Sequence, residues 1–172
     1  MVVRSVVRRS RLKELGVGRA TFRAAGVPVP VGATVDIPID KKIKASVTIE
    51  NTGSQSLTRD FTAFICYADT LSDSSGDPET DFTTWYSEAD ETDVHTVTGV
   101  TLNPGDTLTI ETSGIAASHW NEGDIIDAGV VVYASVAGTY EYYDSLKVTD
   151  AVRIIAPATR VEITDVTFSE TD

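Results

Sequence analysis

Apolar and polar side chains alternate along much of the chain after residue 26. Residues 43–49 place isoleucine, alanine and valine at every second position, with lysine, serine and threonine between them. A period of two predicts a strand with one buried face. Residues 61–68 (FTAFICYA) are apolar on both faces, which favours a central strand.

Further strands are predicted at residues 94–102, 107–112 and 125–155. Asn103-Pro104-Gly105-Asp106 predicts a turn between the first two, because proline presets the second position and glycine supplies a positive φ at the third. Residues 136–139 predict a short hairpin turn within the last segment. About eight short strands, with no convincing helix between them, predict an all-β fold: an antiparallel immunoglobulin-like β-sandwich of about 7–9 strands with an extended N-terminal arm. The one helix candidate, residues 5–15, is weak because of its β-branched valines.

Several segments resemble immunoglobulin-like domains of the CARDB kind, which occur in bacterial and archaeal surface proteins and in virion decoration or tail proteins. The similar segments are VPVGATVDIPI, KASVTIENTGS and FTAFICYAD, followed by LNPGDTLTI and GDIIDAGVVVYAS. The resemblance covers residues 29–155. It implies the sandwich fold and names no activity.

The chain divides into a basic N-terminal arm at residues 1–26, the sandwich at 27–157 and a C-terminal strand or tail at 158–172. Residues 160–168 (RVEITDVTF) alternate again beyond Pro157. Two interpretations stay open for this segment. It closes an edge of its own sheet, or it adds a strand to the sheet of a neighbouring chain.

Composition excludes several classes of protein. The 172 residues include one cysteine, Cys66, so neither an intrachain disulfide framework nor a cysteine-cluster metal site can form. No apolar run approaches the length of a membrane span. The net charge of −12 argues against nucleic-acid binding by the body.

The charge is unevenly distributed. Residues 1–24 carry seven basic side chains and one acidic side chain, a net charge of +6, while the remaining residues carry seven basic and 25 acidic side chains, a net charge of −18. Such a basic arm can bind an acidic partner, including another copy of the chain; the alternative is a solvated terminus. The candidate partner-binding residues are Arg4, Arg8, Arg9, Arg11, Lys13, Arg19 and Arg23. The arm lacks the continuous apolar stretch of a secretory signal, so we expect no export by that route.

Residues 69–93 are predicted to form a long acidic connection without lysine or arginine. Four carboxylates crowd part of it and are candidate calcium ligands, although their spacing does not match an EF-hand. The alternative is a solvated acidic loop. These residues are Asp73, Asp77, Glu79 and Asp81.

Aromatic side chains supply a second candidate site. Trp85, Trp120 and Tyr140 are candidate ligand or interface aromatics, and the alternative is packing in the core. Tyr140 and Tyr142 are predicted on one face of their strand, with Tyr143 on the other.

No catalytic motif is recognised. Neither His95 nor His119 stands in a sequence motif that pairs a nucleophile with a histidine base. Cys66 lies in the most apolar strand, and no phosphate-binding glycine loop occurs. We therefore expect a non-enzymatic protein without a cofactor, apart from the calcium candidate.

The function expected is that of a virion component made in the host cytoplasm. Such a protein would serve as a head decoration, spike base or tail protein, with a homo-oligomer, a capsid protein or a tail protein as its partner. A cell-surface adhesion or carbohydrate-binding module is the alternative, and a small hydrolase fits least.

Overall fold

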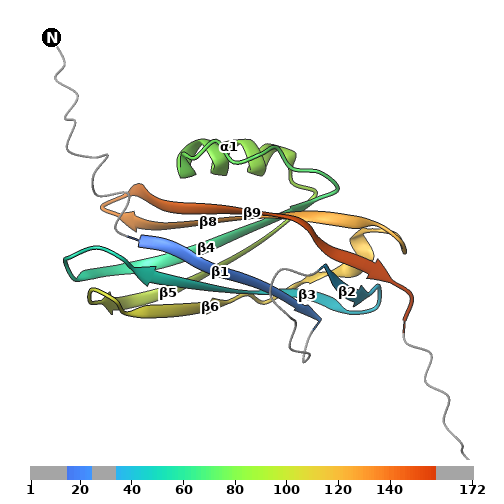
Figure 1. Ribbon diagram of the computed structural model, residues 1–172, viewed down its shortest axis with the longest axis horizontal. Coiled ribbons are helices and arrows are strands. Elements are labelled where there is room, and N and C mark those ends of the chain that lie inside the picture. Colours follow the sequence, from blue (N-terminus) through green and yellow to red (C-terminus); the bar gives the residue numbers. More distant parts are fainter. Residues whose placement is uncertain (1–14, 25–33, 158–172) are drawn as a thin grey trace, which may run out of the picture.

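The computed structural model describes residues 15–24 and 34–157, and within them the chain forms two β-sheets and one α-helix (Figure 1). The fold is all-β, as predicted, with nine strands among the described residues. The strands are β1 Leu15–Ala24, β2 Val35–Pro38, β3 Lys42–Asn51, β4 Leu57–Ala68, β5 Glu91–Leu102, β6 Thr107–Glu111, β7 Ile115–Ala116, β8 Ile125–Val136 and β9 Thr139–Ile155. The helix is α1, Pro78–Glu88, and a short 3-10 turn spans Ala117–His119.

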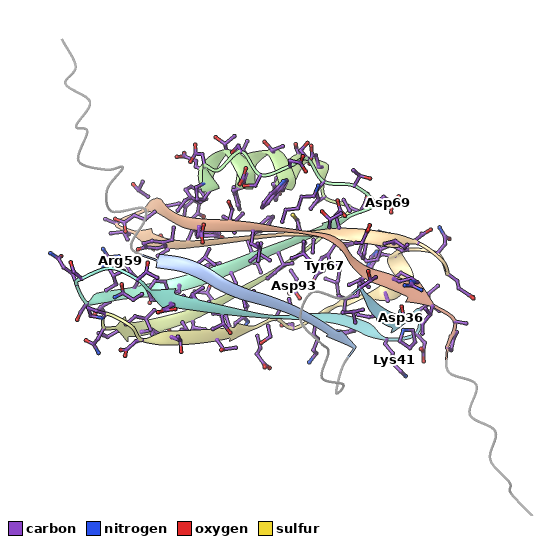
Figure 2. All side chains as sticks on the ribbon, viewed as in Figure 1. Asp36, Lys41, Arg59, Tyr67, Asp69 and Asp93 are labelled. Atoms are coloured by element: carbon purple, nitrogen blue, oxygen red, sulfur yellow. The ribbon has the colours of Figure 1, made fainter. Side chains whose placement is uncertain are left out.

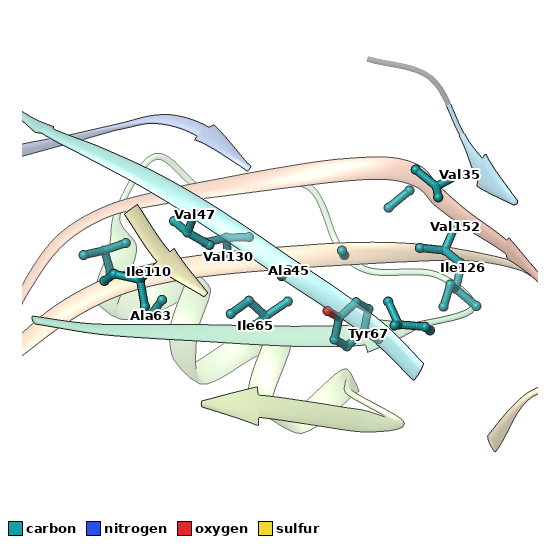
Figure 3. Close-up of a cluster of buried hydrophobic side chains, with 14 of the residues drawn as sticks. Val35, Ala45, Val47, Ala63, Ile65, Tyr67, Ile110, Ile126, Val130 and Val152 are labelled. Carbon is teal, nitrogen blue, oxygen red and sulfur yellow. The ribbon is translucent and has the colours of Figure 1, made fainter. Parts of the chain in front are cut away.

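The two sheets pack face to face. The smaller sheet has the order β1-β3-β6, with β7 also paired to β3, and the larger has the order β2-β9-β8-β4-β5. Neighbouring strands are antiparallel except β2, which pairs parallel with β9. Figure 3 shows side chains from both sheets in the core between them, with Ala45 and Val47 of β3 close to Ile65 and Tyr67 of β4.

The predicted alternation of β3 is confirmed, since Ile43, Ala45, Val47 and Ile49 are all buried. The prediction for β4 is confirmed too, because residues 61–68 are buried at every position. Their inner side chains lie in the core between the sheets. Phe64, Cys66 and Ala68 lie in a second cluster, on the outer face of the larger sheet beneath α1.

Helix α1 corrects the prediction of a long connection over residues 69–93 and of a sandwich without a helix. It starts with Pro78, a residue that suits the first turn of a helix because it lacks the N–H that would be unpaired there. Asp77 occupies the N-cap position, and two acidic residues in the first turn complement the helix dipole. Phe82, Trp85 and Tyr86 are the large apolar residues of the helix, and they span little more than one turn among polar residues, so the helical pattern in the sequence is short.

Strand β1 corrects the boundary of the N-terminal arm. The arm was predicted over residues 1–26, but Leu15–Ala24 pair antiparallel with β3, from Leu15 opposite Asn51 to Ala24 opposite Ile43. These ten residues therefore belong to the smaller sheet. The helix candidate at residues 5–15 and the strand predicted at 160–168 fall mainly or wholly outside the described residues.

Both predicted turns are present. Asp106 N donates to Asn103 O (2.9 Å), and Gly105 has φ 84°. In the hairpin between β8 and β9, Ala137 and Gly138 both have positive φ, at 49° and 81°. Two consecutive positive φ values define the type I′ turn that matches the twist of a two-residue hairpin.

Two edge strands of the larger sheet differ greatly in length. β2 has four residues, whereas β5 has 12 and pairs only with β4 among the described strands. In its register with β4, one irregularity lies between Arg59 and Phe61, where Gly99 N donates to Asp60 Oδ1 (2.7 Å).

No helix among the described residues has the length and apolar character needed to cross a membrane.

Candidate functional site

A cluster of aromatic side chains on the outer face of the larger sheet forms the candidate site. It consists of Tyr133 on β8, Tyr140 and Tyr142 on β9, and Phe82 and Tyr86 on α1, and we call it the tyrosine face. Figure 1 shows α1 lying over this side of the sheet, beside β8 and β9. The site therefore combines side chains from a hairpin and from a helix nearly 50 residues earlier in the sequence.

The hairpin and the helix each align their own members. Tyr133 lies opposite Tyr142 in the β8–β9 register, and Tyr140 shares the face of Tyr142 because side chains alternate along a strand. Phe82 and Tyr86 are four positions apart, which places them on one side of a helix. Tyr143 lies in the core against Phe61 (5.9 Å between ring centroids), as its predicted alternation requires.

Phe82 is the centre of the cluster. Its ring centroid lies 5.7 Å from that of Tyr133, 5.5 Å from that of Tyr142 and 6.0 Å from that of Tyr86, with which it is stacked. Tyr140 adds to the same network at 5.0 Å from Tyr133. Aromatic pairs at these separations stabilise one another, so the five rings form one packed cluster.

Two of the five rings are largely exposed. Tyr86 is 62% exposed and Tyr140 56%, while Phe82, Tyr133 and Tyr142 are half-buried beneath them. Large aromatic side chains that are both ordered and exposed are typical of binding surfaces, because they bury much area at little cost in entropy.

The apolar surface continues to β5, the edge strand of the larger sheet among the described residues. Phe64 lies beside both helix aromatics, 4.8 Å from Phe82 and 6.1 Å from Tyr86 between ring centroids. Its partner in the β4–β5 register is Val94, which is 49% exposed. Val94 therefore joins Tyr86 and Tyr140 as an exposed large apolar side chain on this side of the sheet.

The surroundings of the tyrosine face are acidic. Residues 60–146, which include α1 and all three hairpin tyrosines of the face, contain no lysine or arginine. Burial raises the pKa of Tyr142, and the nearby carboxylate of Glu79 raises it further. Arg59 lies near the hairpin, but its Nε pairs with Glu141 Oε2 (3.3 Å). The face therefore favours neutral or cationic ligands over anionic ones.

Asp81 holds α1 to the rest of the molecule. Its Oδ2 accepts hydrogen bonds from Ser74 Oγ (2.6 Å) and Ser145 Oγ (2.6 Å), and its Oδ1 accepts from the backbone N–H and hydroxyl of Ser75, both at 2.7 Å. Burial opposes ionisation of this carboxyl, but the hydrogen bonds from Ser145, Ser74 and Ser75 outweigh it and lower the pKa. The contact with Ser145 joins the helix to β9.

The four predicted calcium ligands have different hydrogen-bond and ion-pair partners and do not converge on one point, which corrects the expectation of a single calcium site. Asp73 is 99% exposed and pairs with Lys147 Nζ (3.2 Å), and Asp77 accepts from Thr80 Oγ1 at the start of α1. Glu79 is exposed on the first turn of the helix, and both oxygens of Asp81 accept from serines. No cluster of three metal-binding side chains is found in the described part of the chain.

The predicted ligand-binding aromatics divide into buried and exposed residues. Trp85 is fully buried beneath α1, with Nε1 donating to Ser72 O (2.9 Å), and Trp120 is buried in the core against Tyr67. Because both rings are buried, neither can stack on a ligand at the protein surface, and their assignment to a ligand site is corrected. Tyr140 is exposed on the tyrosine face. Sequence reasoning missed Phe82 and Tyr86, for which the spacing of four was the available signal.

The predicted arm residues fall in two groups. Arg19 and Arg23 lie on β1, opposite Thr48 and Lys44 of β3. The others lie outside the described residues; they are Arg4, Arg8, Arg9, Arg11 and Lys13.

A polar pocket of about 300 Å³ lies at the opposite end of β4 from Arg59 (Figure 2). His119 Nδ1 lies 2.8 Å from Glu91 Oε1, and Asp124 Oδ2 accepts from the Asn121 backbone N–H (2.7 Å). His119 pairs with Glu91, and the Asn121 side chain donates to Asp124, while no serine, threonine or cysteine lines the pocket to act as a nucleophile. The lining residues are Asp69, Asp90, Glu91, His119, Trp120, Asn121 and Asp124.

No known family model matches the chain, and no curated protein matches its sequence. Among solved structures, it is similar to the C-terminal domain of wzt, with a TM-score of 0.48 and 10% identity over 92% of this chain and 85% of that chain. It is also similar to the Pseudomonas fluorescens alkylpurine DNA glycosylase AlkC bound to DNA containing an abasic site analog (TM-score 0.41, 14% identity, 90% of this chain and 36% of that chain). A third is the ligand binding region of Serine-glutamate repeat protein A of Enterococcus faecium (TM-score 0.31, 11% identity, 81% and 99%). None of these similarities assigns an activity to this chain.

Proposed function

We propose that this protein is a non-enzymatic assembly protein that docks on other protein chains as a component of a virion. Its place would be a head decoration, a spike base or a tail, and it would be made in the host cytoplasm. The observation that carries the proposal is the tyrosine face, where Tyr86 and Tyr140 are exposed on rings that are already packed against one another. Ordered aromatic residues of this kind are the commonest anchors of protein interfaces.

The strand order supports an immunoglobulin-like form of the sandwich. In variable-type immunoglobulin domains one sheet runs G-F-C-C′. The order β9-β8-β4-β5 has the same arrangement, with β5 as the additional edge strand. We propose on this basis, and on the segments quoted above, that the domain is related to the CARDB kind.

The long edge at β5 supports a role in contacts between chains. Over residues 94–102 the strand carries neither lysine, proline nor a carboxylate, the residues that usually protect an exposed edge. A strand from another chain can therefore pair with the N–H and C=O groups on the side of β5 that faces away from β4. The alternating residues 160–168 have the composition for such a strand.

The environments of the reactive side chains support a non-enzymatic role. Cys66 is fully buried, and desolvation raises the pKa of its thiol to about 12, so the reactive thiolate does not form near neutral pH. His119 pairs with Glu91, without a nucleophile beside it among the residues that line its pocket.

The proposal can be tested on purified particles from the source of the sequence. Quantitative mass spectrometry should find the protein at a fixed ratio to the main structural protein, and Tyr86→Ser/Tyr140→Ser should lower its incorporation at least tenfold. Ile125→Ser is the matched control, because Ile125 is 45% exposed at the other end of β8. Particles that lack the protein, or that incorporate the double variant normally, would refute the proposal.

Carbohydrate binding at a cell surface is the second candidate, and the exposed rings of Tyr86 and Tyr140 also favour it, since sugars stack on such rings. A glycan array separates the two functions. Saturable binding of one glycan class, lost in Tyr86→Ser/Tyr140→Ser and kept in Ile125→Ser, would favour the carbohydrate module. Binding to assembled particles with no glycan signal would favour the assembly protein.

A further inference from the structure

We propose that the tyrosine face binds the arginine-rich segment 1–14 of a second copy of this chain. This inference rests on the proposed assembly function and names the partner of its main surface. Segment 1–14 contains Arg4, Arg8, Arg9, Arg11 and Lys13, with Glu14 as its only acidic residue.

Charge complementarity is the first argument. Segment 1–14 has a net charge of +4, from five basic side chains and one acidic side chain, and the rest of the chain has a net charge of −16, from nine basic and 25 acidic side chains. The tyrosine face lies within the stretch 60–146, which has no lysine or arginine of its own. A basic segment therefore meets no repulsion from that stretch.

The chemistry of the rings is the second argument. A guanidinium group is planar, stacks on the face of an aromatic ring and at the same time donates hydrogen bonds to a carboxylate. Tyr86 and Tyr140 offer exposed rings, and Glu79 places a carboxylate close enough to Tyr142 to raise its pKa. The segment contains four arginines and one lysine, which suits stacking better than the reverse ratio would.

The position of β1 is the third argument. A series of contacts connects the start of β1 to the start of β4. Leu15 pairs with Asn51, and the side-chain amide of Asn51 donates to Leu102 O. Leu102 in turn pairs with Leu57, the first residue of β4. Arg59, two residues along β4, contacts Glu141 beside Tyr140. Figure 1 likewise shows β1 beginning at the end of the molecule where β8 turns into β9. The basic segment therefore joins the body at the end that carries Tyr140.

The direction of β1 favours a second copy over the same chain. β1 runs away from this end and pairs with β3 along its length, from Leu15 opposite Asn51 to Ala24 opposite Ile43, so the backward continuation of its axis leads away from the body (Figure 1). Fourteen extended residues span up to about 46 Å, at roughly 3.3 Å per residue, which is enough to reach a neighbour. Docking on its own tyrosine face would need a reversal of direction around the hairpin. A contact between segment 1–14 of one copy and the face of the next is heterologous, and it builds a ring or a chain of subunits.

Sedimentation velocity on the full-length chain tests the inference through two variants. The arm variant is Arg4→Ser/Arg8→Ser/Arg9→Ser/Arg11→Ser, and the face variant is Tyr86→Ser/Tyr140→Ser. The wild-type chain should self-associate, more weakly at high salt, and each variant should associate at least tenfold more weakly. An equal mixture of the two variants should form a heterodimer, because each supplies the surface that the other lacks.

Two further variants distinguish the chemistry. Replacing the same four arginines by lysine keeps the charge and removes the planar guanidinium, so association should fall between that of the wild type and that of the arm variant. Ile125→Ser should associate as the wild type does.

Three results would overturn the inference. They are a wild-type chain that stays monomeric to millimolar concentration, variants that associate like the wild type, and a mixture that forms no heterodimer. The last would indicate that the segment does not join two copies. If particles require the tyrosine face but incorporate the arm variant normally, the inference fails while the proposed function stands.

Discussion

The packing of α1 against the larger sheet can be tested by a substitution at Gly129, which lies on β8 beneath Trp85. A Cβ atom at this position would lie 2.7 Å from Trp85 Cε3 and 2.8 Å from Cys66 Sγ. Both separations are shorter than non-bonded atoms tolerate. Gly129→Ala therefore forces the indole ring, and with it α1, to move.

The size of the effect follows from two opposing contributions. Overpacking of a close-packed core costs about 1–3 kcal/mol. Gly129 is not among the glycines with positive φ, so alanine adds no such backbone strain and recovers about 0.4–1 kcal/mol by restricting the unfolded chain. The free energy of unfolding should fall by about 1–2 kcal/mol, and Tm by about 2–8 °C for a chain of this length.

Urea denaturation followed by tryptophan fluorescence and far-UV circular dichroism measures this change. The double variant Cys66→Ala/Gly129→Ala is the control, because removal of Sγ opens space for the new methyl group. The two substitutions should couple by about 0.5 kcal/mol or more in a double-mutant cycle. A Gly129→Ala protein as stable as the wild type, or strictly additive with Cys66→Ala, would refute the packing of α1 described above.

Three further predictions concern stability and reactivity. Asp81→Asn should lower the free energy of unfolding by about 1–3 kcal/mol at neutral pH, because an amide accepts fewer of the four serine hydrogen bonds. Since the folded pKa of Asp81 is lowered, its stabilisation is present above about pH 4 and is lost as the pH falls further; urea titrations at several pH values should show a smaller acid loss in Asp81→Asn. Cys66 should react with a maleimide only when the protein unfolds, so the labelling rate should rise with denaturant concentration as unfolding does. Rapid labelling of the native protein would contradict the burial of Cys66. Ala137→Asn should raise Tm by about 1–4 °C, because asparagine tolerates the positive φ of this turn position better than alanine, and a lower Tm would contradict the type I′ geometry.

Contacts between neighbours in sequence could be predicted from the chain alone. The alternation of residues 43–49 determines which face of β3 is buried, and the proline and glycine at positions 104 and 105 determine a turn that the structure confirms. The apolar run 61–68 indicated a strand covered on both sides. In each case the period of the strand or the φ preference of a residue suffices, because the signal lies within a few residues.

Helix α1 could not be predicted in the same way. Its stability depends on Trp85 meeting Cys66 and Gly129, and on Asp81 meeting Ser145, which are contacts with strands far away in sequence. The helix itself has a narrow apolar stripe and an acidic first turn, which favoured a solvated loop. Tertiary packing therefore decided its conformation.

The candidate site shows the same division between sequence and tertiary structure. Strand alternation alone places Tyr140 and Tyr142 on one face, apart from Tyr143. Only the packing of α1 brings Phe82 and Tyr86 to these tyrosines, and only burial removes Trp85 and Trp120 from the surface. The sequence by itself determined the strands, the turns and the uneven charge, because these depend on local geometry and composition. The tertiary structure decided which aromatic rings reach the surface together, because exposure depends on which segments the fold places over one another.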